Sequence, residues 1–196
     1  MSGPDPCQLR VILGSTRPVR AGEPVARWVF ETIQQRHDVA AEFIDLAEVN
    51  LPFLDEPRQP SDGDYQHEHT RRWSAMIEPV DAVILVIPEY NHSFNAATKN
   101  ALDFLYHEWR YKAVGIVCYG GGARGTRAAQ HLKPVLSALR MIHVGDVAVG
   151  LSEVDVTEGR LEPPARLQHQ LGVLLDEAVR LTPHLRQLRQ VGPGGQ

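Results

Sequence analysis

The chain has 196 residues, of which 43% are hydrophobic and 22% charged, a globular composition that excludes disorder over its whole length. Its net charge of -4 argues against general nucleic-acid binding, which needs a basic surface. The longest apolar run, residues 82–88, is too short to cross a bilayer, and no signal peptide is visible. We therefore expect a cytoplasmic protein with no nucleic-acid or membrane partner. Its two cysteines, Cys7 and Cys118, are expected to be free thiols in a reducing compartment.

Short β-branched apolar runs alternate with longer helical patterns along the chain. The runs predict strands at residues 10–13, 39–46, 80–87, 113–119 and 142–149. The helical patterns lie at residues 23–36, 65–77, 94–106, 125–139 and 164 to about 189. Residues 50–64 are expected to form a long loop, and a turn-rich link is expected to precede the last helix. The tail, 192–196, is expected to be disordered.

Strands separated by helices predict a parallel α/β sheet, because parallel neighbours need crossover connections. We see no internal repeat and no boundary of a second domain, so residues 1–191 are expected to form one domain. Ligands of such sheets bind beyond the C-terminal ends of the strands, near the point where the strand order reverses. The segments that follow the first, third and fourth strands are therefore the candidates for function.

The segment after the first strand reads GSTRPVRAG, residues 14–22, and leads into a helix. Free amides and the dipole at a helix N-terminus favour an anion. The hydroxyls of Ser15 and Thr16 can donate to it, and Arg17 and Arg20 can bind phosphate oxygens. The segment is neither a Walker A loop nor a G-x-G-x-x-G fingerprint, so it suits a single phosphate better than a pyrophosphate. The alternative is a solvated turn with a helix cap.

Two further loops are expected at the same edge. After the third strand, Pro88 ends the strand, Asn91 and Ser93 suit a tight polar turn, and the ring of Tyr90 can stack on a planar ligand. After the fourth strand, YGGGARG at residues 119–125 lets the backbone approach a ligand closely. Taken singly, the second loop is better interpreted as a loop tyrosine with a capping serine, and the alternative for the third is a flexible turn.

Together these motifs resemble a known family. GSTR in the first loop, PEYN-x-S followed by KNALDF in the second, and the glycine-rich third loop followed by RA-x-x-x-L-K-P-V-L look like the NAD(P)H-dependent FMN reductases. That group has the flavodoxin-like fold and includes quinone, azo-dye and chromate reductases. The resemblance runs from about residue 9 to 149 and implies a doubly wound five-stranded parallel sheet of order 2-1-3-4-5, with helices on both faces.

The resemblance also implies FMN as cofactor and assigns residues to it. Ser15, Arg17 and Arg20 would hold the phosphate. Tyr90 would lie against the isoalloxazine, with the Asn91 backbone near its reactive edge. The full expected FMN-binding set is Ser15, Thr16, Arg17, Arg20, Gly22, Pro88, Glu89, Tyr90, Asn91, His92, Ser93, Gly120, Gly121, Gly122 and Arg124.

The chain departs from the family pattern at a few positions. Many relatives carry Ser and Asn where this chain has Ala21 and Gly22. Binding of the phosphate is therefore expected to depend on Arg20. A smaller residue, often glycine, is common where His92 stands. The third loop has no serine beside its glycines.

The chemistry implied by the resemblance needs no catalytic side chain, because flavin N5 is the reactive centre. NADPH or NADH would be the electron donor, and the acceptor would be a free flavin, a quinone, an azo compound or a metal oxyanion, with ping-pong kinetics. Members of the family are usually dimers or tetramers, so the implied partner is a second copy of the chain. Residues 55–64 are expected to form a dimer contact that helps to cover the site.

Other functions compete with this one. The first is a non-catalytic flavodoxin-like electron carrier or ligand-sensing module; the second is a hydrolase or transferase that uses the first loop on a substrate. His67 and His69 invite a metal site, but two residues apart on a predicted helix they would not share a face, and no Cys/His cluster accompanies them. Cys118 could be a redox thiol, but a small buried hydrophobe is the commoner role at a strand end.

Overall fold

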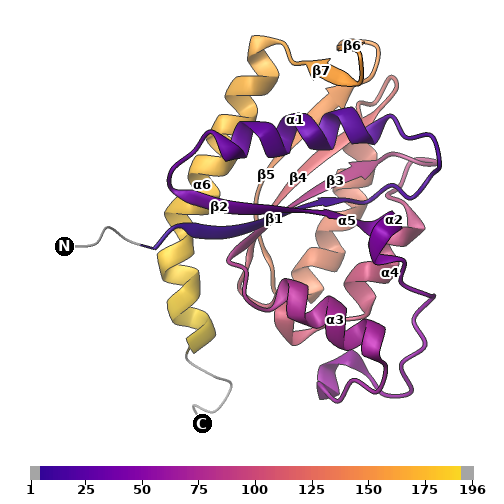
Figure 1. The fold of residues 1–196 in the computed structure, drawn as a ribbon, viewed down its shortest axis with the longest axis vertical. Coiled ribbons are helices and arrows are strands. Elements are labelled where there is room, and N and C mark those ends of the chain that lie inside the picture. Colours follow the sequence, from indigo (N-terminus) through magenta and orange to yellow (C-terminus); the bar gives the residue numbers. More distant parts are fainter. Residues whose placement is uncertain (1–4, 191–196) are drawn as a thin grey trace.

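The computed structural model describes residues 5–190 and contains one five-stranded parallel sheet. Its strand order is β2-β1-β3-β4-β5, and every adjacent pair is parallel (Figure 1). The strands are β1 (Cys7–Leu13), β2 (Val39–Asp45), β3 (Ala82–Pro88), β4 (Ala113–Gly120) and β5 (Ile142–Gly150). The expected sheet and its order 2-1-3-4-5 are confirmed.

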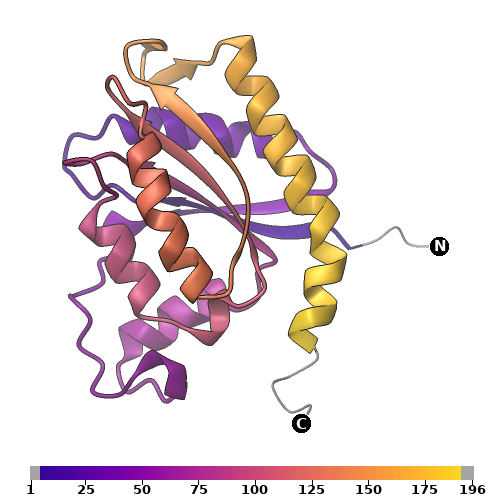
Figure 2. The ribbon, with the colours of Figure 1, turned by 180° about the vertical axis from the view of Figure 1, so that it is seen from behind.

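Helices cover both faces of the sheet (Figures 1 and 2). One face is covered by α1 (Gly22–Gln34) and α6 (Ala165–Gln190). The other face is covered by α3 (Glu68–Ile77), α4 (Ala96–Asp103) and α5 (Thr126–Ala138). The fold is therefore doubly wound, as predicted.

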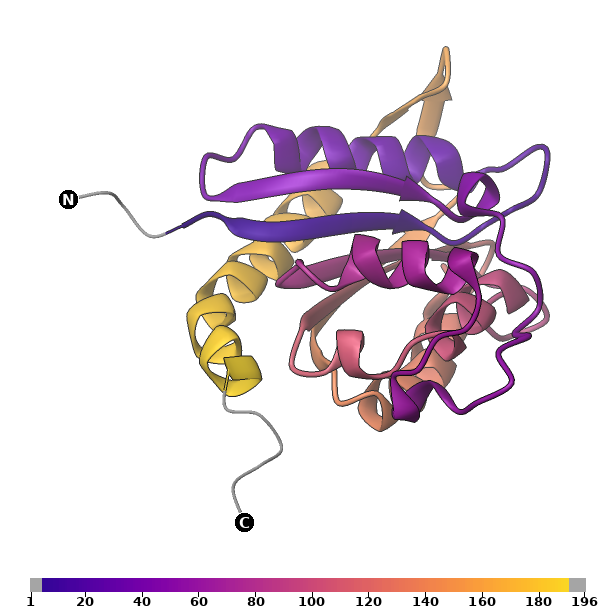
Figure 3. The ribbon, with the colours of Figure 1, turned by 60° about the horizontal axis from the view of Figure 1, so that its bottom comes forward.

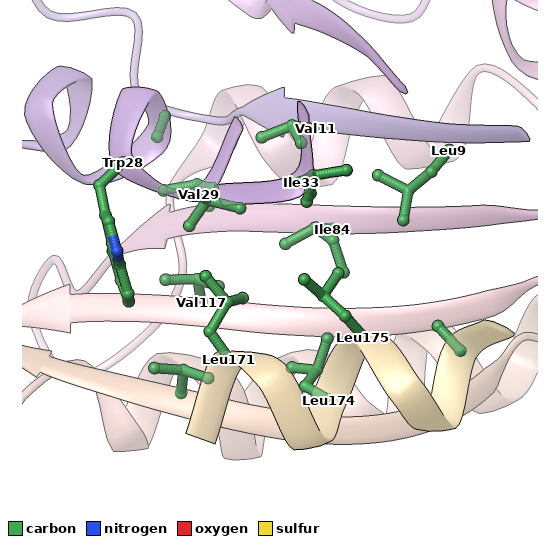
Figure 4. Close-up of a cluster of buried hydrophobic side chains, with 14 of the residues drawn as sticks. Leu9, Val11, Trp28, Val29, Ile33, Ile84, Val117, Leu171, Leu174 and Leu175 are labelled. Atoms are coloured by element: carbon green, nitrogen blue, oxygen red, sulfur yellow. The ribbon is translucent and has the colours of Figure 1, made fainter. Parts of the chain in front are cut away.

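Each face of the sheet carries its own apolar core. Figure 4 shows the core under α1 and α6, where Ile33 from α1 and Leu174 from α6 point at the strands. Strand side chains such as Ile84 are fully buried there. A completely buried aliphatic side chain stabilises the fold by roughly 1.5–3 kcal/mol, so these layers fix the sheet that carries the loops.

The predicted strands and helices begin and end within three residues of the observed ones, and two of the differences have identifiable causes. The second strand ends at Asp45, because Leu46 begins the short helix α2 (Leu46–Val49) and the Asp45 carboxylate accepts a hydrogen bond from the Ala47 amide at 2.8 Å. The third helix begins at Glu68 instead of residue 65. Its preceding amides, on Gln66 and His67, donate to the Glu56 carboxylate at 2.8 and 3.0 Å.

Two predictions of element type were incomplete. The helix expected at residues 94–106 is shorter and is followed by a 3-10 turn, η2 (His107–Trp109). The turn-rich link contains an antiparallel hairpin of β6 (Asp155–Thr157) and β7 (Arg160–Glu162). Three-residue strands are too short to show a periodic pattern in sequence. Another 3-10 turn, η1 (Pro60–Asp62), lies in the long loop. The expected disordered tail, 192–196, lies outside the described residues.

The described part of the chain, residues 5–190, has no helix that combines the length and apolar character needed to span a bilayer.

Figure 3 shows the strands nearly side-on, with the connections to α1 and α2 leaving from the C-terminal ends of β1 and β2.

The C-terminal half of α6 is tied to the N-terminal edge of the sheet by Asp81, which is buried. Its carboxylate accepts hydrogen bonds from the Gln8 amide at 2.9 Å, from Arg186 at 2.5 and 2.8 Å, and from Arg189 at 2.5 Å. Burial raises the pKa of Asp81, but the hydrogen bonds from Arg186 and Gln8 and the charges of both arginines outweigh it and lower the pKa below its usual value.

We expect Asp81→Asn to lower the free energy of unfolding at pH 7 by about 2 kcal/mol, the range for hydrogen bonds to a charged group. Because the folded-state pKa lies below the unfolded one, this stabilisation is present above pH ~4 and disappears as the pH falls through the folded-state pKa. Urea unfolding at pH 7 and pH 3 measures the loss of stability. As a control, Asp176→Asn at an exposed ion pair should lower the free energy of unfolding by less than about 0.5 kcal/mol. An equal loss at both pH values would contradict the assignment.

The N-terminus of α1 packs against the end of β4 at Gly22. A Cβ atom on Gly22 would lie 2.1 Å from the hydroxyl oxygen of Tyr119 and 2.4 Å from its ring, and Tyr119 is buried. Gly172, in the middle of α6, has open space around the same position. Packing against Tyr119 therefore requires glycine at position 22, whereas no neighbouring atom requires it at position 172.

We expect Gly22→Ala to destabilise the protein by about 1–3 kcal/mol through overpacking. Gly172→Ala should instead stabilise it by about 0.5–1 kcal/mol, since alanine is the better helix former and meets nothing there. Thermal or urea unfolding of the two variants gives the comparison. If Gly22→Ala proves as stabilising as its control, Tyr119 does not occupy this position.

Candidate functional site

Three loops meet at the C-terminal edge of the sheet. The first loop (residues 14–21) follows β1, the second loop (residues 89–95) follows β3, and the third loop (residues 121–125) follows β4. Parallel pairing brings these three strand ends to one edge. Hydrogen bonds join the first loop to the second, and Glu89 of the second loop bonds to the strand and the helix that flank the third. The three segments that the sequence singled out therefore lie together at this edge.

The first loop contacts the second through two polar bonds. The hydroxyl oxygens of Ser15 and Tyr90 lie 3.0 Å apart. The Asn95 side-chain amide donates to the Gly14 carbonyl at 2.6 Å, and Thr98 donates to the Asn95 side chain at 2.8 Å. Asn95 and Thr98 are buried, so these bonds fix where the first loop leaves β1.

The charged residues of the first loop lie in different environments. Arg17 is exposed, with its guanidinium carbon 6.0 Å from the centre of the Tyr90 ring. Arg20 is largely buried and donates to both carboxylate oxygens of Asp45 and to the Ser15 carbonyl. Thr16 is exposed and lines a cavity of about 590 Å³ that extends between α2 and α4.

The N-terminus of α1 adds unpaired donors to the first loop. The residue before the helix is Ala21, whose side chain has no hydrogen-bond acceptor and therefore cannot cap the helix. The first amides of an α-helix have no partner inside the helix. Positive potential therefore collects where the first loop meets Gly22.

The second loop is a tight turn directly after Pro88, the last residue of β3. Tyr90 and Ser93 exchange both backbone hydrogen bonds, at 2.8 and 3.0 Å. The two residues between them, Asn91 and His92, are exposed and have φ angles of 49° and 68°. Positive φ at both central positions favours Asn and Gly, which accounts for the glycine of the family pattern at position 92. His92 departs from that pattern at a constrained position, and nothing in the structure explains the substitution.

Glu89 connects the second loop to the helix behind the third. Its amide donates to the Tyr119 carbonyl at 2.9 Å. Its carboxylate accepts from the Arg127 amide at 3.2 Å and from the Arg127 guanidinium at 3.1 Å. Glu89 therefore caps the first turn of α5, where the preceding residue, Gly125, offers no side chain.

The third loop is open toward solvent. A Cβ atom on Gly121 or Gly122 would meet nothing within 4 Å. Gly120, in contrast, is buried, and a Cβ atom on it would lie 3.1 Å from the Gly125 nitrogen. Arg124 is exposed, has a φ angle of 52°, and donates to Glu153 at 2.6 Å. Its guanidinium is thus held toward the segment that follows β5.

Several polar residues that shape this edge were missed by the sequence reasoning: Asp45, Asn95, Thr98, Tyr119 and Arg127. Tyr119 is buried beside Ser15; burial raises its pKa to about 12, although the Ser15 hydroxyl lowers it in part, so it stays protonated at neutral pH. Asp45 alone gave a usable signal, as a carboxylate at the end of a strand. The partners of Asn95, Tyr119 and Arg127 are distant in sequence, and Thr98 bonds to the Asn95 side chain.

The histidine and cysteine alternatives can be placed as well. His67 precedes α3 instead of lying in it, and its ring stacks on that of His69 with centroids 5.2 Å apart, so the expectation that the two do not share a face was wrong. Among the described residues, no group of three or more His, Cys, Asp or Glu side chains is arranged to hold a metal ion. Cys118 is buried, and burial raises its pKa to about 12, which is typical of a small core residue.

Comparison with known proteins supplies the family. The model of the NADPH-dependent FMN reductases matches residues 8–155. An NAD(P)H-dependent FMN reductase of Schizosaccharomyces pombe is 36% identical over 170 residues, which cover 85% of this chain and 84% of that protein.

Two solved structures show the same fold at low sequence identity. The flavoenzyme NAD(P)H:(acceptor) oxidoreductase FerB of Paracoccus denitrificans superposes with a TM-score of 0.71 at 21% identity, covering 90% of this chain and 98% of its own. A flavodoxin of Streptococcus pneumoniae superposes with a TM-score of 0.53 at 9% identity, covering 89% and 99%. The fold is flavodoxin-like, and the chain belongs to the NADPH-dependent FMN reductase family of oxidoreductases.

Proposed function

We propose that this protein binds FMN across its three loops and uses it to transfer reducing equivalents from NADPH or NADH to a small acceptor. The observation that carries the proposal is the 3.0 Å contact between Ser15 and Tyr90. It joins the loop suited to a phosphate with the loop suited to a planar ring, as one continuous FMN site requires. The acceptors we propose are a free flavin, a quinone, an azo compound or a metal oxyanion.

The residues at this edge fit FMN on two counts. The α1 N-terminus presents amides without a side-chain cap, next to the hydroxyl of Ser15 and the exposed charge of Arg17. The open positions at Gly121 and Gly122 leave the third-loop backbone accessible to a ligand. These features suit a phosphate at the first loop and a flat, polar-edged ring at the other two.

The roles of individual residues follow from where each lies. Ser15, Thr16 and Arg17 are proposed to contact the phosphate, with Arg20 and Gly22 behind them. Pro88, Glu89, Tyr90, Asn91, His92 and Ser93 are proposed to place the backbone of the second loop along the ring. Gly120, Gly121, Gly122 and Arg124 are proposed to border its pyrimidine or ribityl side.

When bound, FMN supplies the redox chemistry, taking hydride from NAD(P)H and passing the electrons to the acceptor with ping-pong kinetics. The chain itself positions the reactants. The Glu89 bonds to Arg127 and the turn at Asn91 and His92 keep the second loop rigid. Rigid placement matters, because small misplacements of reacting groups are costly in rate.

A second copy of the chain is the partner we propose. Val19 in the first loop is 86% exposed, and Phe53, in the segment after α2, is 83% exposed. Leu54 beside it is also exposed, while its amide and the Pro52 carbonyl are held by Asn100 of α4. Exposed large apolar side chains near a site favour an interface. A mass of one chain by sedimentation at micromolar concentration would contradict this.

A non-catalytic electron carrier with the same fold would also bind FMN, so binding and turnover have to be measured separately. We expect the purified chain to take up FMN at micromolar concentration in preference to FAD, because the first loop accommodates one phosphate. We expect it then to oxidise NADPH or NADH in the presence of a quinone, an azo dye or excess flavin. Initial rates at varied donor and acceptor should give parallel double-reciprocal lines.

Each outcome decides between the two functions. FMN uptake without donor oxidation against any of these acceptors would identify a carrier or a sensing module. A preference for FAD, or no uptake of any flavin, would overturn the assignment of the site itself. Chromatography of the flavin released by heat identifies the cofactor. The absorbance of the reduced nicotinamide, at about 340 nm, follows donor oxidation.

A further inference from the structure

The Arg20 side chain makes more bonds inside the protein than a free ligand-binding arginine would. It donates from both terminal nitrogens to the two oxygens of Asp45, at 2.6 and 2.5 Å, and to the Ser15 carbonyl at 3.0 Å. A guanidinium has five N–H groups, so these bonds use three of them. The side chains of Arg20 and Asp45 are only 14% and 8% exposed.

Asp45 is itself fixed from a second side. It is the last residue of β2, and one of its oxygens accepts from the Ala47 amide, capping α2. Its position is therefore set by the sheet and by that helix. Through Arg20 it connects the end of β2 to the Ser15 carbonyl in the first loop. This forked pair is the only link from Arg20 to β2 among the hydrogen bonds of residues 5–190.

The charges around Arg20 are already balanced. Asp45 carries the opposite charge at ion-pair distance, and Glu23 in the first turn of α1 lies 3.8 Å from the same guanidinium. Arg17 differs in each respect. It is exposed, it forms no ion pair within residues 5–190, and its guanidinium lies over the Tyr90 ring. A phosphate at the first loop would meet net positive charge from Arg17 and from the α1 amides.

We infer that Asp45 is a positioning residue: its forked ion pair with Arg20, here called the clamp, fixes the shape of the first loop. Arg17 is then the one arginine of the first loop whose charge is left for the phosphate, beside the α1 amides. The inference rests on the proposed FMN site and changes the expected role of Arg20 within it. Losing the clamp distorts the loop whether or not a ligand is present. Losing Arg17 affects only the bound phosphate.

Asp45→Asn separates the two roles of Arg20 by the sign of its effect. Asparagine keeps the size of the side chain and can still cap α2. If Arg20 were chiefly a phosphate ligand, removing the competing carboxylate would release its charge and tighten FMN binding. If the clamp shapes the loop, the same change weakens FMN binding, by about tenfold or more, and also lowers the stability of the flavin-free protein.

The companion variants make the comparison complete. Arg17→Met should weaken FMN by about tenfold, as expected for loss of a charge-assisted contact, with riboflavin affinity and flavin-free stability nearly unchanged. Arg20→Lys keeps the charge but loses the fork, so it should weaken FMN several-fold under the clamp and leave it near wild type if only charge matters. It also serves where Asp45→Asn fails to fold.

The matched control lies at the other end of the same strand. Arg36 donates to both oxygens of Asp38, at 2.9 and 2.7 Å, just before β2 begins. Asp38→Asn should leave FMN affinity within about twofold of wild type.

Flavin affinities from fluorescence titration and urea unfolding of the flavin-free chain give all the readouts. In the cycle of Arg20→Met, Asp45→Asn and the double variant, the stability losses should be far from additive, because each single change breaks the same pair. Tighter FMN binding in Asp45→Asn, or additive stability losses, would overturn the clamp. A chain that binds no flavin at all would refute the proposed function, and the unfolding cycle would still decide the clamp.

Discussion

The parallel pairing of β1 with β3 is the constraint on which the site depends. The chain leaves β1 toward α1, on one face of the sheet, and leaves β3 toward α4, on the other face. The two loops therefore leave neighbouring strand ends toward opposite faces of the sheet, and this switch point is the usual place for a ligand in an open α/β sheet. The buried strands hold this geometry without help from a ligand, since both apolar cores are complete in the chain itself.

Polar contacts then fix the shape of this edge. Asn95 fixes the exit of the first loop, the forked pair of Arg20 and Asp45 fixes its far end, and Glu89 fixes the second loop against α5. These groups are buried or nearly so, and a buried polar group left without a partner is costly. The edge that is suited to FMN is thus rigid before any flavin binds, which lowers the entropy that binding has to overcome.

The sequence was sufficient for the strands, the helices and the three loops, because each depends on a local pattern. Apolar runs such as residues 82–88 indicate buried strands, and the motifs after them carry the family resemblance. The sequence was insufficient where a residue distant along the chain determines an element boundary or the environment of a side chain. The start of α3 depends on Glu56, eleven residues from His67, and the environment of Arg20 depends on Asp45, twenty-five residues away. The hairpin of β6 and β7 was missed because its strands have only three residues each.

The central claim is that FMN lies across the three loops at the C-terminal edge, and amide hydrogen exchange with and without FMN tests it most directly. The account predicts slower exchange at residues 14–23, 89–93 and 120–125 when FMN is added, with no change around Lys112 at the opposite edge. Riboflavin should protect the second and third loops but not the first, since it lacks the phosphate. Protection confined to other segments, or FMN binding without protection of residues 14–23, would contradict it.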